Sequence, residues 1–174
     1  MALNFSSYVK AQINEIVGIF KANSAKGRFV SEENIHLTLE FLGEVQKDKL
    51  SLIYEAMNLL DIKPFTLNLN KTGLFKRREG NIYWLSVEKN DTLLSLQHKL
   101  HQNLIGKGFE LEAREYRPHI TIGRKVELKD GFNTDELNEI ISKITIDIDS
   151  VDLMKSEFIN GNLKYTVLYS KPLT

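Results

Sequence analysis

The stretch His36-Leu37-Thr38-Leu39 decides how this chain folds, because its pattern returns at His119-Ile120-Thr121-Ile122. Each copy reads histidine, aliphatic residue, threonine, aliphatic residue. This period of two is typical of a β-strand, in which residues i and i+2 project from the same face. Each strand would present an imidazole beside a hydroxyl, with two aliphatic side chains underneath. Two of the chain's four histidines take part, so we interpret the repeat as one paired site.

The composition is that of an ordinary globular protein. The 174 residues are 42% hydrophobic and 26% charged, enough for one well-buried domain over residues 1–174. Lys plus Arg number 23 and so do Asp plus Glu, so any RNA contact must be local. The absence of cysteine excludes disulfides, thiolate nucleophiles and Cys-ligated zinc. No apolar run or signal peptide suggests a membrane or export, so we expect a cytoplasmic protein without a membrane partner. We also expect a monomer.

Outward from the two motifs, the pattern predicts helices alternating with pairs of strands. The first motif strand should span about 35–42, with Leu37, Leu39 and Phe41 in the core. Helices are expected at about 6–23, 47–60, 91–105 and 134–143, and further strands at 65–69, 82–87, 144–153, 155–159 and 163–171. The second motif strand follows Pro118. Because each half contains one motif in the same order of elements, we predict a pseudo-duplicated α+β fold whose motif strands meet across a central cleft.

Two histidines facing each other across a cleft are suited to acid–base catalysis. With an ordinary pKa of about 6.5, one imidazole can be neutral while the other is charged near pH 7. One could take a proton from water while the other protonates a leaving oxygen. Thr38 and Thr121 could hold the non-bridging oxygens of a phosphodiester. A 2′,3′-cyclic phosphate suits this set because ring strain favours opening, so the motifs predict phosphoester chemistry without a metal.

A metal centre is the main alternative chemistry. His36 and His119 would need further ligands, and the nearest acid on the same strand face is Glu40. His98 and His101 have a spacing that could bind a metal from one helix, but their polar neighbours favour a solvated helix face.

Several cationic and aromatic residues could assist phosphate or base binding. Arg117 shares strand parity with His119 and should face the cleft if the strand is regular there. Arg124 has the opposite parity and would need a strand end or bulge at Gly123. Lys76-Arg77-Arg78 is a basic patch that a solvated hairpin tip explains equally well. Four aromatic residues could form a stacking platform, although core packing is the commoner fate of the first: Phe41, Phe75, Trp84 and Tyr116.

These residues resemble those of a known family. The paired His-x-Thr motifs are the signature of the two-histidine (2H) phosphoesterases. The flanking sequence resembles the LigT-like branch, the RNA 2′,3′-cyclic phosphodiesterases (ThpR proteins) once described as 2′-5′ RNA ligases. The stretches that carry the resemblance are Gly27 to Val30, Asn34 to Val45, Pro64 to Leu67 and Tyr116 to Arg124. The likeness covers nearly the whole chain. The opening apolar stretch, Met1 to Phe5, is shorter than usual, so we expect a truncated start or a sheet short by part of a strand.

The resemblance implies a bilobal α+β fold with two antiparallel sheets flanking the cleft and helices outside. It also implies hydrolysis of RNA 2′,3′-cyclic phosphate ends, or small cyclic nucleotides, to 2′-phosphomonoesters without a cofactor. His36 would be the proton donor to the 3′ oxygen and His119 the acceptor from water. Thr38 and Thr121 would hold the phosphate, assisted by Arg124 and Arg117. Two alternatives stay open: 2′-5′ ligation, which is the reverse reaction, and a non-catalytic module that binds nucleotides.

Overall fold

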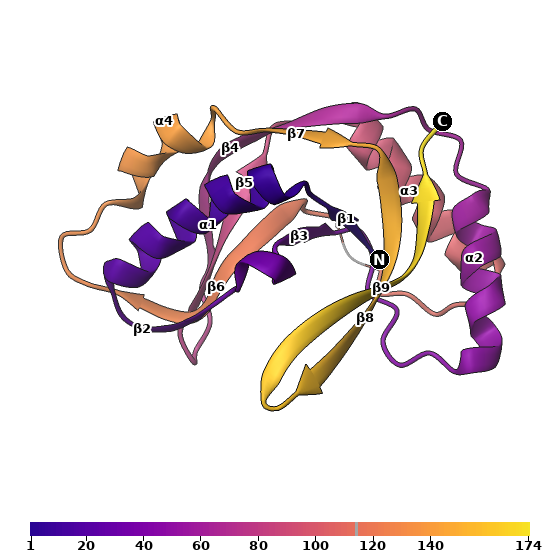
Figure 1. The fold of residues 1–174 in the computed structure, drawn as a ribbon, viewed down its shortest axis with the longest axis horizontal. Coiled ribbons are helices and arrows are strands. Elements are labelled where there is room, and N and C mark those ends of the chain that lie inside the picture. Colours follow the sequence, from indigo (N-terminus) through magenta and orange to yellow (C-terminus); the bar gives the residue numbers. More distant parts are fainter. Residues whose placement is uncertain (114) are drawn as a thin grey trace.

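The computed structural model describes residues 1–113 and 115–174 and contains two antiparallel sheets with helices packed around them (Figure 1). Arg114 lies outside the described residues. The four-stranded sheet has the order β3 (His36–Thr38), β1 (Ala2–Asn4), β8 (Ser150–Ile159), β9 (Asn162–Pro172). The five-stranded sheet has the order β2 (Ser24–Phe29), β6 (His119–Leu128), β5 (Asn81–Val87), β4 (Phe65–Phe75), β7 (Thr145–Ile148). Each sheet contains one motif strand, and the predicted α+β class is confirmed.

The described residues form four α-helices, and two of them begin at a capping side chain. They are α1 (Ser7–Ala22), α2 (Leu50–Asn58), α3 (Asp91–Gly106) and α4 (Asn138–Ile141). The side chain of Ser6 accepts a hydrogen bond from the Val9 amide, and Asn90 caps α3 in the same way. The apolar stripe of α3 is buried at Leu93, Leu96, Leu100 and Leu104. In the described part of the chain, no helix has the length and apolar character to span a membrane.

The predicted strand at 144–153 is two strands in different sheets. Ile146 and Ile148 belong to β7, which pairs with β4 in the five-stranded sheet. After Asp149 the chain enters β8, which pairs with β1 and β9 in the other sheet. The alternation of apolar and polar residues shifts by one position at Asp149-Ser150, between Ile148 and Val151, so the sequence marks the crossing that the single predicted strand overlooked.

The first motif strand is shorter than predicted. β3 covers only His36–Thr38 because its partner, β1, has three residues. The amides of Leu39 and Glu40 then donate to the carbonyl oxygen of Met1, and the chain leaves the sheet. Leu37 and Leu39 are buried as expected, whereas Phe41 is 60% exposed, so its predicted core position is wrong.

The closing hairpin is confirmed, and its strands are longer than predicted. Asn160 and Gly161 have φ values of 51° and 79°. Positive φ at both central residues is the type I′ turn, whose twist matches that of the paired strands. β8 and β9 remain paired from Ser150 opposite Pro172 to Ile159 opposite Asn162. The far half of this hairpin projects away from the rest of the molecule (Figure 1).

Candidate active site

The two motif strands meet although they belong to different sheets. Cα atoms of β3 and β6 approach within 8 Å of one another. Leu37, Ile120 and Ile122 are fully buried and share one hydrophobic core. The histidine and threonine side chains of both motifs are only partly buried. The period of two therefore sends the aliphatic residues into a common core and leaves the polar residues at the surface above it.

Each motif histidine forms a hydrogen bond with the backbone carbonyl oxygen two residues upstream. Nδ1 of His36 lies 2.7 Å from the carbonyl oxygen of Asn34. Nδ1 of His119 lies 2.7 Å from the carbonyl oxygen of Arg117. A carbonyl oxygen can only accept, so Nδ1 donates its proton in each ring. Each neutral imidazole then has its basic lone pair on Nε2, the nitrogen required for proton transfer to or from a ligand.

Aromatic rings flank both imidazoles. The ring of Tyr165 on β9 lies 4.7 Å from that of His36. Phe75 and Trp84 lie 5.3 Å and 5.9 Å from the ring of His119. These contacts restrict the orientations that the imidazoles can adopt. A stacking role of Phe75 and Trp84 toward a nucleotide base stays a prediction.

Burial and nearby positive charge act on His36. Burial lowers the pKa of His36 below its ordinary value because desolvation disfavours the imidazolium. The hydrogen bond to Asn34 opposes this shift, whereas the amino group of Met1, Lys10 and Arg124 strengthen it. The same positive charges would attract an anion placed against His36.

The sequence analysis required a strand end or a bulge at Gly123 for Arg124 to face the cleft, and β6 has an irregularity there. Trp84 stands opposite Thr121, but the next pair joins Tyr83 to Gly123, so β6 contains one additional residue at this point. This irregularity is a β-bulge, which changes the direction of the following side chains. Arg124 is exposed, and its charge lowers the pKa of His36 on the other sheet.

Arg117 was expected to face the cleft only if it belonged to a regular strand, and it lies before the strand begins. β6 begins at His119, so the regular strand assumed for Arg117 is absent there. Its guanidinium donates two hydrogen bonds to Glu115, at 3.0 and 2.8 Å, and its side chain is 72% exposed. The structure therefore brings the Arg117 carbonyl, rather than its charge, to His119. Substrate binding by Arg117 stays a prediction.

A half-buried polar cluster missed by the sequence analysis supports the first motif. Nδ1 of His101 on α3 lies 2.7 Å from Oε2 of Glu40, and Gln97 donates to the same oxygen at 3.3 Å. His98 is exposed, but the solvated face predicted for His101 is wrong. The sequence pattern located the helix face and could not show the acid that meets it. These contacts attach α3 to the chain two residues after Thr38.

Tyr116 also connects the two motifs. Its hydroxyl donates to the carbonyl oxygen of Thr38 at 3.2 Å. Burial, with a smaller contribution from the charge of Glu40, raises the pKa of Tyr116. The phenol therefore stays neutral and keeps its donor proton. The segment that precedes His119 is thus attached to the motif of His36.

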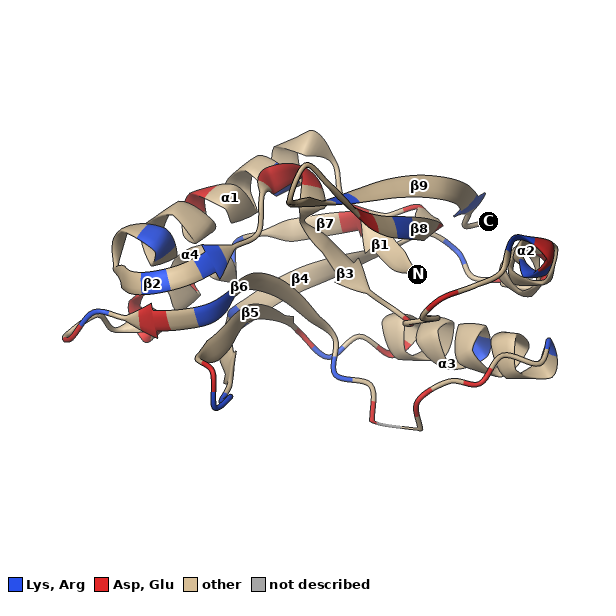
Figure 2. Cartoon of the chain, turned by 90° about the horizontal axis from the view of Figure 1, so that it is seen from below, with Lys and Arg blue, Asp and Glu red and all other residues tan. Residues whose placement is uncertain are grey.

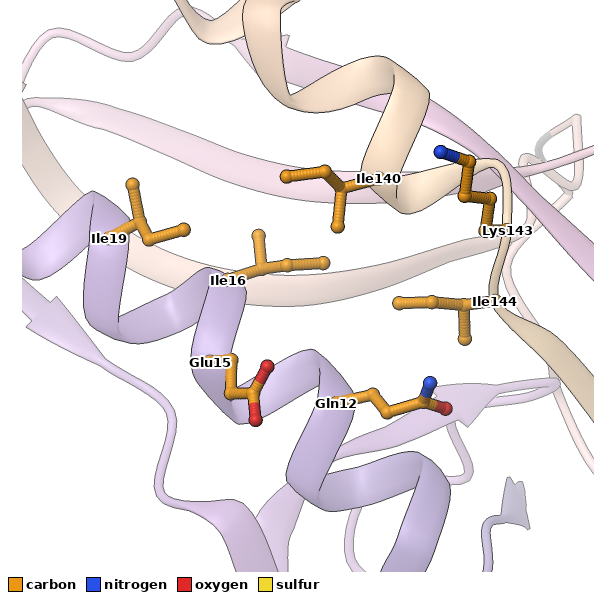
Figure 3. Close-up of a pocket in the computed structure, with 7 residues that line it drawn as sticks. All are labelled: Gln12, Glu15, Ile16, Ile19, Ile140, Lys143 and Ile144. Carbon is orange, nitrogen blue, oxygen red and sulfur yellow. The ribbon is translucent and has the colours of Figure 1, made fainter.

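Over the described residues, charges of both signs are mixed (Figure 2), and one hollow lies away from the two motifs. Seen from below, segments with Lys or Arg and segments with Asp or Glu are mixed over the fold (Figure 2). Lys76, Arg77 and Arg78 are exposed in the turn between β4 and β5. A hollow of about 230 Å³ lies between α1 and the end of α4, lined by Ile16, Ile19, Ile140 and Ile144 with Gln12, Glu15 and Lys143 (Figure 3). It contains no motif residue.

Removing one of the positive charges near His36 should raise the pKa of that histidine. We expect Lys10→Gln and Arg124→Gln each to shift the His36 titration toward higher pH, because protonation of the ring no longer meets that charge. Burial remains, so the pKa should stay below the ordinary value. NMR titration of the imidazole protons measures the shift. Lys21→Gln, an exposed change on the same helix as Lys10, is the control. An unchanged titration in both test variants would contradict the electrostatic explanation.

The fold and site define a class of protein: two antiparallel sheets, each contributing one His-x-Thr strand to a shared surface. A family profile described as the 2′-5′ RNA ligase superfamily matches residues 8–157. The chain belongs to this superfamily, and the resemblance noted in the sequence is confirmed.

Curated relatives extend the likeness over the full chain. A Thermotoga maritima protein named RNA 2′,3′-cyclic phosphodiesterase is 34% identical, over 97% of this chain and 91% of its own. A Methanocaldococcus jannaschii protein of the same name is 32% identical, over 100% of this chain and 91% of its own. The crystal structure of Escherichia coli LigT complexed with 3′-AMP is similar with a TM-score of 0.84 and 26% identity, covering 99% of this chain and 95% of that one.

Proposed function

We propose that this protein hydrolyses RNA 2′,3′-cyclic phosphodiester ends to 2′-phosphomonoesters without a metal ion. The observation that carries the proposal is the pair of motif histidines, each with its Nδ1–H held by a carbonyl oxygen, on two strands that meet. The names of the relatives support the substrate class. The complex of Escherichia coli LigT with 3′-AMP supports a nucleotide as ligand.

The proposed reaction uses one histidine for each proton. Nε2 of His119 takes a proton from water while the water oxygen forms a bond to phosphorus. The bond between phosphorus and O3′ breaks, and Nε2 of His36 gives its proton to O3′. The phosphate remains on O2′, and the two rings regain their starting protonation by exchange with solvent. The family resemblance supplies this order of roles. The lowered pKa of His36 favours its neutral form in the free protein, so the donor role requires the bound phosphate to favour protonation.

The neighbouring hydroxyls and cations stabilise charge on the phosphate. Thr38 and Thr121 share strand faces with His36 and His119, so their hydroxyls can donate to non-bridging oxygens as negative charge increases. Arg124 supplies positive charge near His36. An anionic phosphate beside His36 would raise its pKa and populate the protonated form that the reaction requires. Arg117 would assist only if its pair with Glu115 opened.

Chelation should leave this reaction intact. We expect hydrolysis of a 2′,3′-cyclic mononucleotide to proceed at the same rate with and without excess EDTA, because imidazoles supply both proton transfers. Phosphorus NMR measures the rate and distinguishes a 2′-phosphate from a 3′-phosphate product. Loss of turnover in EDTA with recovery on adding a divalent cation would contradict the proposal. Binding without turnover under both conditions would favour the non-catalytic module.

A further inference from the structure

The projecting half of the β8–β9 hairpin has one apolar face without a core behind it. Phe158 is 76% exposed, Val167 46% and Leu163 38%. The strand register places Phe158 opposite Leu163, Ser156 opposite Tyr165 and Met154 opposite Val167. Residues two apart on a strand, and residues directly opposite, share a face of the sheet. These six residues therefore form one continuous surface, which we call the hairpin face.

The opposite side of the same hairpin is mostly polar, with Ile159 as its apolar residue. Lys155, Glu157 and Ile159 alternate there with the residues of the hairpin face, and Lys164 stands opposite Glu157. Lys155 and Glu157 form an ion pair at 2.7 Å. A hairpin that serves only to project into water needs no apolar side. The difference between the two sides indicates that the hairpin face contacts a ligand.

The hairpin face begins at the candidate active site. The ring of Tyr165 lies 4.7 Å from that of His36. The side-chain amide of Asn34 donates to the carbonyl oxygen of Leu163 at 2.8 Å. The carbonyl oxygen of the same Asn34 accepts from Nδ1 of His36. One residue thus fixes both the catalytic imidazole and the position of the hairpin relative to it.

We propose that the hairpin face is a stacking platform for the RNA bases at and before the cyclic phosphate. The inference rests on the proposed function, in which His36 protonates O3′. The ribose that bears O3′, and every nucleotide 5′ to it, must then leave the phosphate on the side of His36. That side continues into Tyr165, Leu163 and Phe158. Aromatic and apolar side chains bind base faces with little regard to sequence, and none of the six residues of the hairpin face carries a charge that would repel the RNA backbone.

The length of the hairpin face suits more than one base. Two residues along a strand advance by about 6.8 Å, which is about twice the spacing of stacked bases. Tyr165 beside His36 is placed for the terminal base, and the pair Phe158 and Leu163 for the base before it. The platform therefore predicts that an RNA oligonucleotide binds more tightly than a mononucleotide with the same cyclic end.

The test compares Phe158→Ala with Ile159→Ala, its neighbour on the polar side, which is 42% exposed. Two substrates are used: a 2′,3′-cyclic mononucleotide and a tetranucleotide with the same cyclic end. In Phe158→Ala, the fold-increase in KM should be about ten times larger for the tetranucleotide than for the mononucleotide. This difference corresponds to the loss of one stacked base. Ile159→Ala should change both KM values equally. Equal effects of the two variants on the tetranucleotide would overturn the platform.

A binding measurement separates this inference from the proposed function. Fluorescence anisotropy of a labelled tetranucleotide ending in a 3′-phosphate gives Kd without turnover. We expect Kd to rise about tenfold in Phe158→Ala and to stay constant in Ile159→Ala. That result in a protein that hydrolyses no cyclic phosphate would support the platform and refute the proposed reaction. The competing occupant of the hairpin face is a second copy of this chain, and sedimentation tests for it. A wild-type dimer that becomes monomeric in Phe158→Ala would overturn the inference.

Discussion

Replacing His119 by alanine is expected to lower kcat for a 2′,3′-cyclic nucleotide about 10²- to 10⁴-fold, and replacing His36 to have a comparable effect. Each variant removes one of the two proton transfers. The hydroxyls of Thr38 and Thr121 remain and can still bind the phosphate. KM should therefore change much less than kcat. Initial rates under saturating substrate measure the loss.

The fold should survive both substitutions. His36 and His119 are only partly buried, whereas the core beneath them is formed by Leu37, Ile120 and Ile122. Thermal unfolding followed by circular dichroism checks this expectation. His98→Ala, an exposed change on α3, is the matched control and should keep the wild-type rate. A near-normal rate in either motif variant would show that the acid–base assignment is wrong.

The double variant provides a second check on the same mechanism. If the two imidazoles act in one reaction, removing the second should cost far less than removing the first, because catalytic groups that act as a unit are not additive. If the reductions in kcat of the two single variants instead multiply in the double variant, His36 and His119 serve separate steps.

Local patterns predicted the paired site, and non-local contacts complete it. The alternation at 36–39 and 119–122 shows which side chains share a face, and the exposed and buried residues follow it. The pattern could not show the carbonyl oxygens of Asn34 and Arg117, because backbone direction before a strand is not encoded in periodicity. Likewise, the parity of Arg124 depended on a bulge in β6. The partner of His101 is Glu40, which is distant in sequence.

In the fold, too, local patterns predicted some elements, whereas non-local contacts determine the others. α1 and α3 were predicted closely because their apolar stripes lie within the helices and their caps, Ser6 and Asn90, directly precede them. The strand at 144–153 was predicted as one element because both β7 and β8 alternate. The shift of the alternation at Asp149-Ser150 marks their boundary, but only the pairing partners show that the two strands belong to different sheets. Phe41 was assigned to the core by continuing the alternation of β3, but the chain leaves the sheet after its short partner β1 ends.

Gly73→Ala should destabilise the protein by about 1–3 kcal/mol through overpacking beside the active site. Gly73 stands opposite Trp84, and a Cβ at this position would overlap atoms of the indole ring. The indole ring also contacts the rings of Phe75 and His119, whose centroids lie 5.0 Å and 5.9 Å from its own. It cannot move away without disturbing at least one of them. Urea unfolding at neutral pH measures the change in free energy.

The position of Trp84 connects this stability effect to catalysis. If the indole ring moves off the strand at Gly73, the contact that orients His119 is lost, so kcat should fall even at temperatures where Gly73→Ala is fully folded. Gly18→Ala is the control, because that glycine lies within α1 and an added Cβ meets no atom within 4 Å. It should raise stability by about 0.5–1 kcal/mol and leave kcat constant. A Gly73→Ala protein with wild-type stability and kcat would mean that the indole can move without affecting His119, and that Trp84 does not position it.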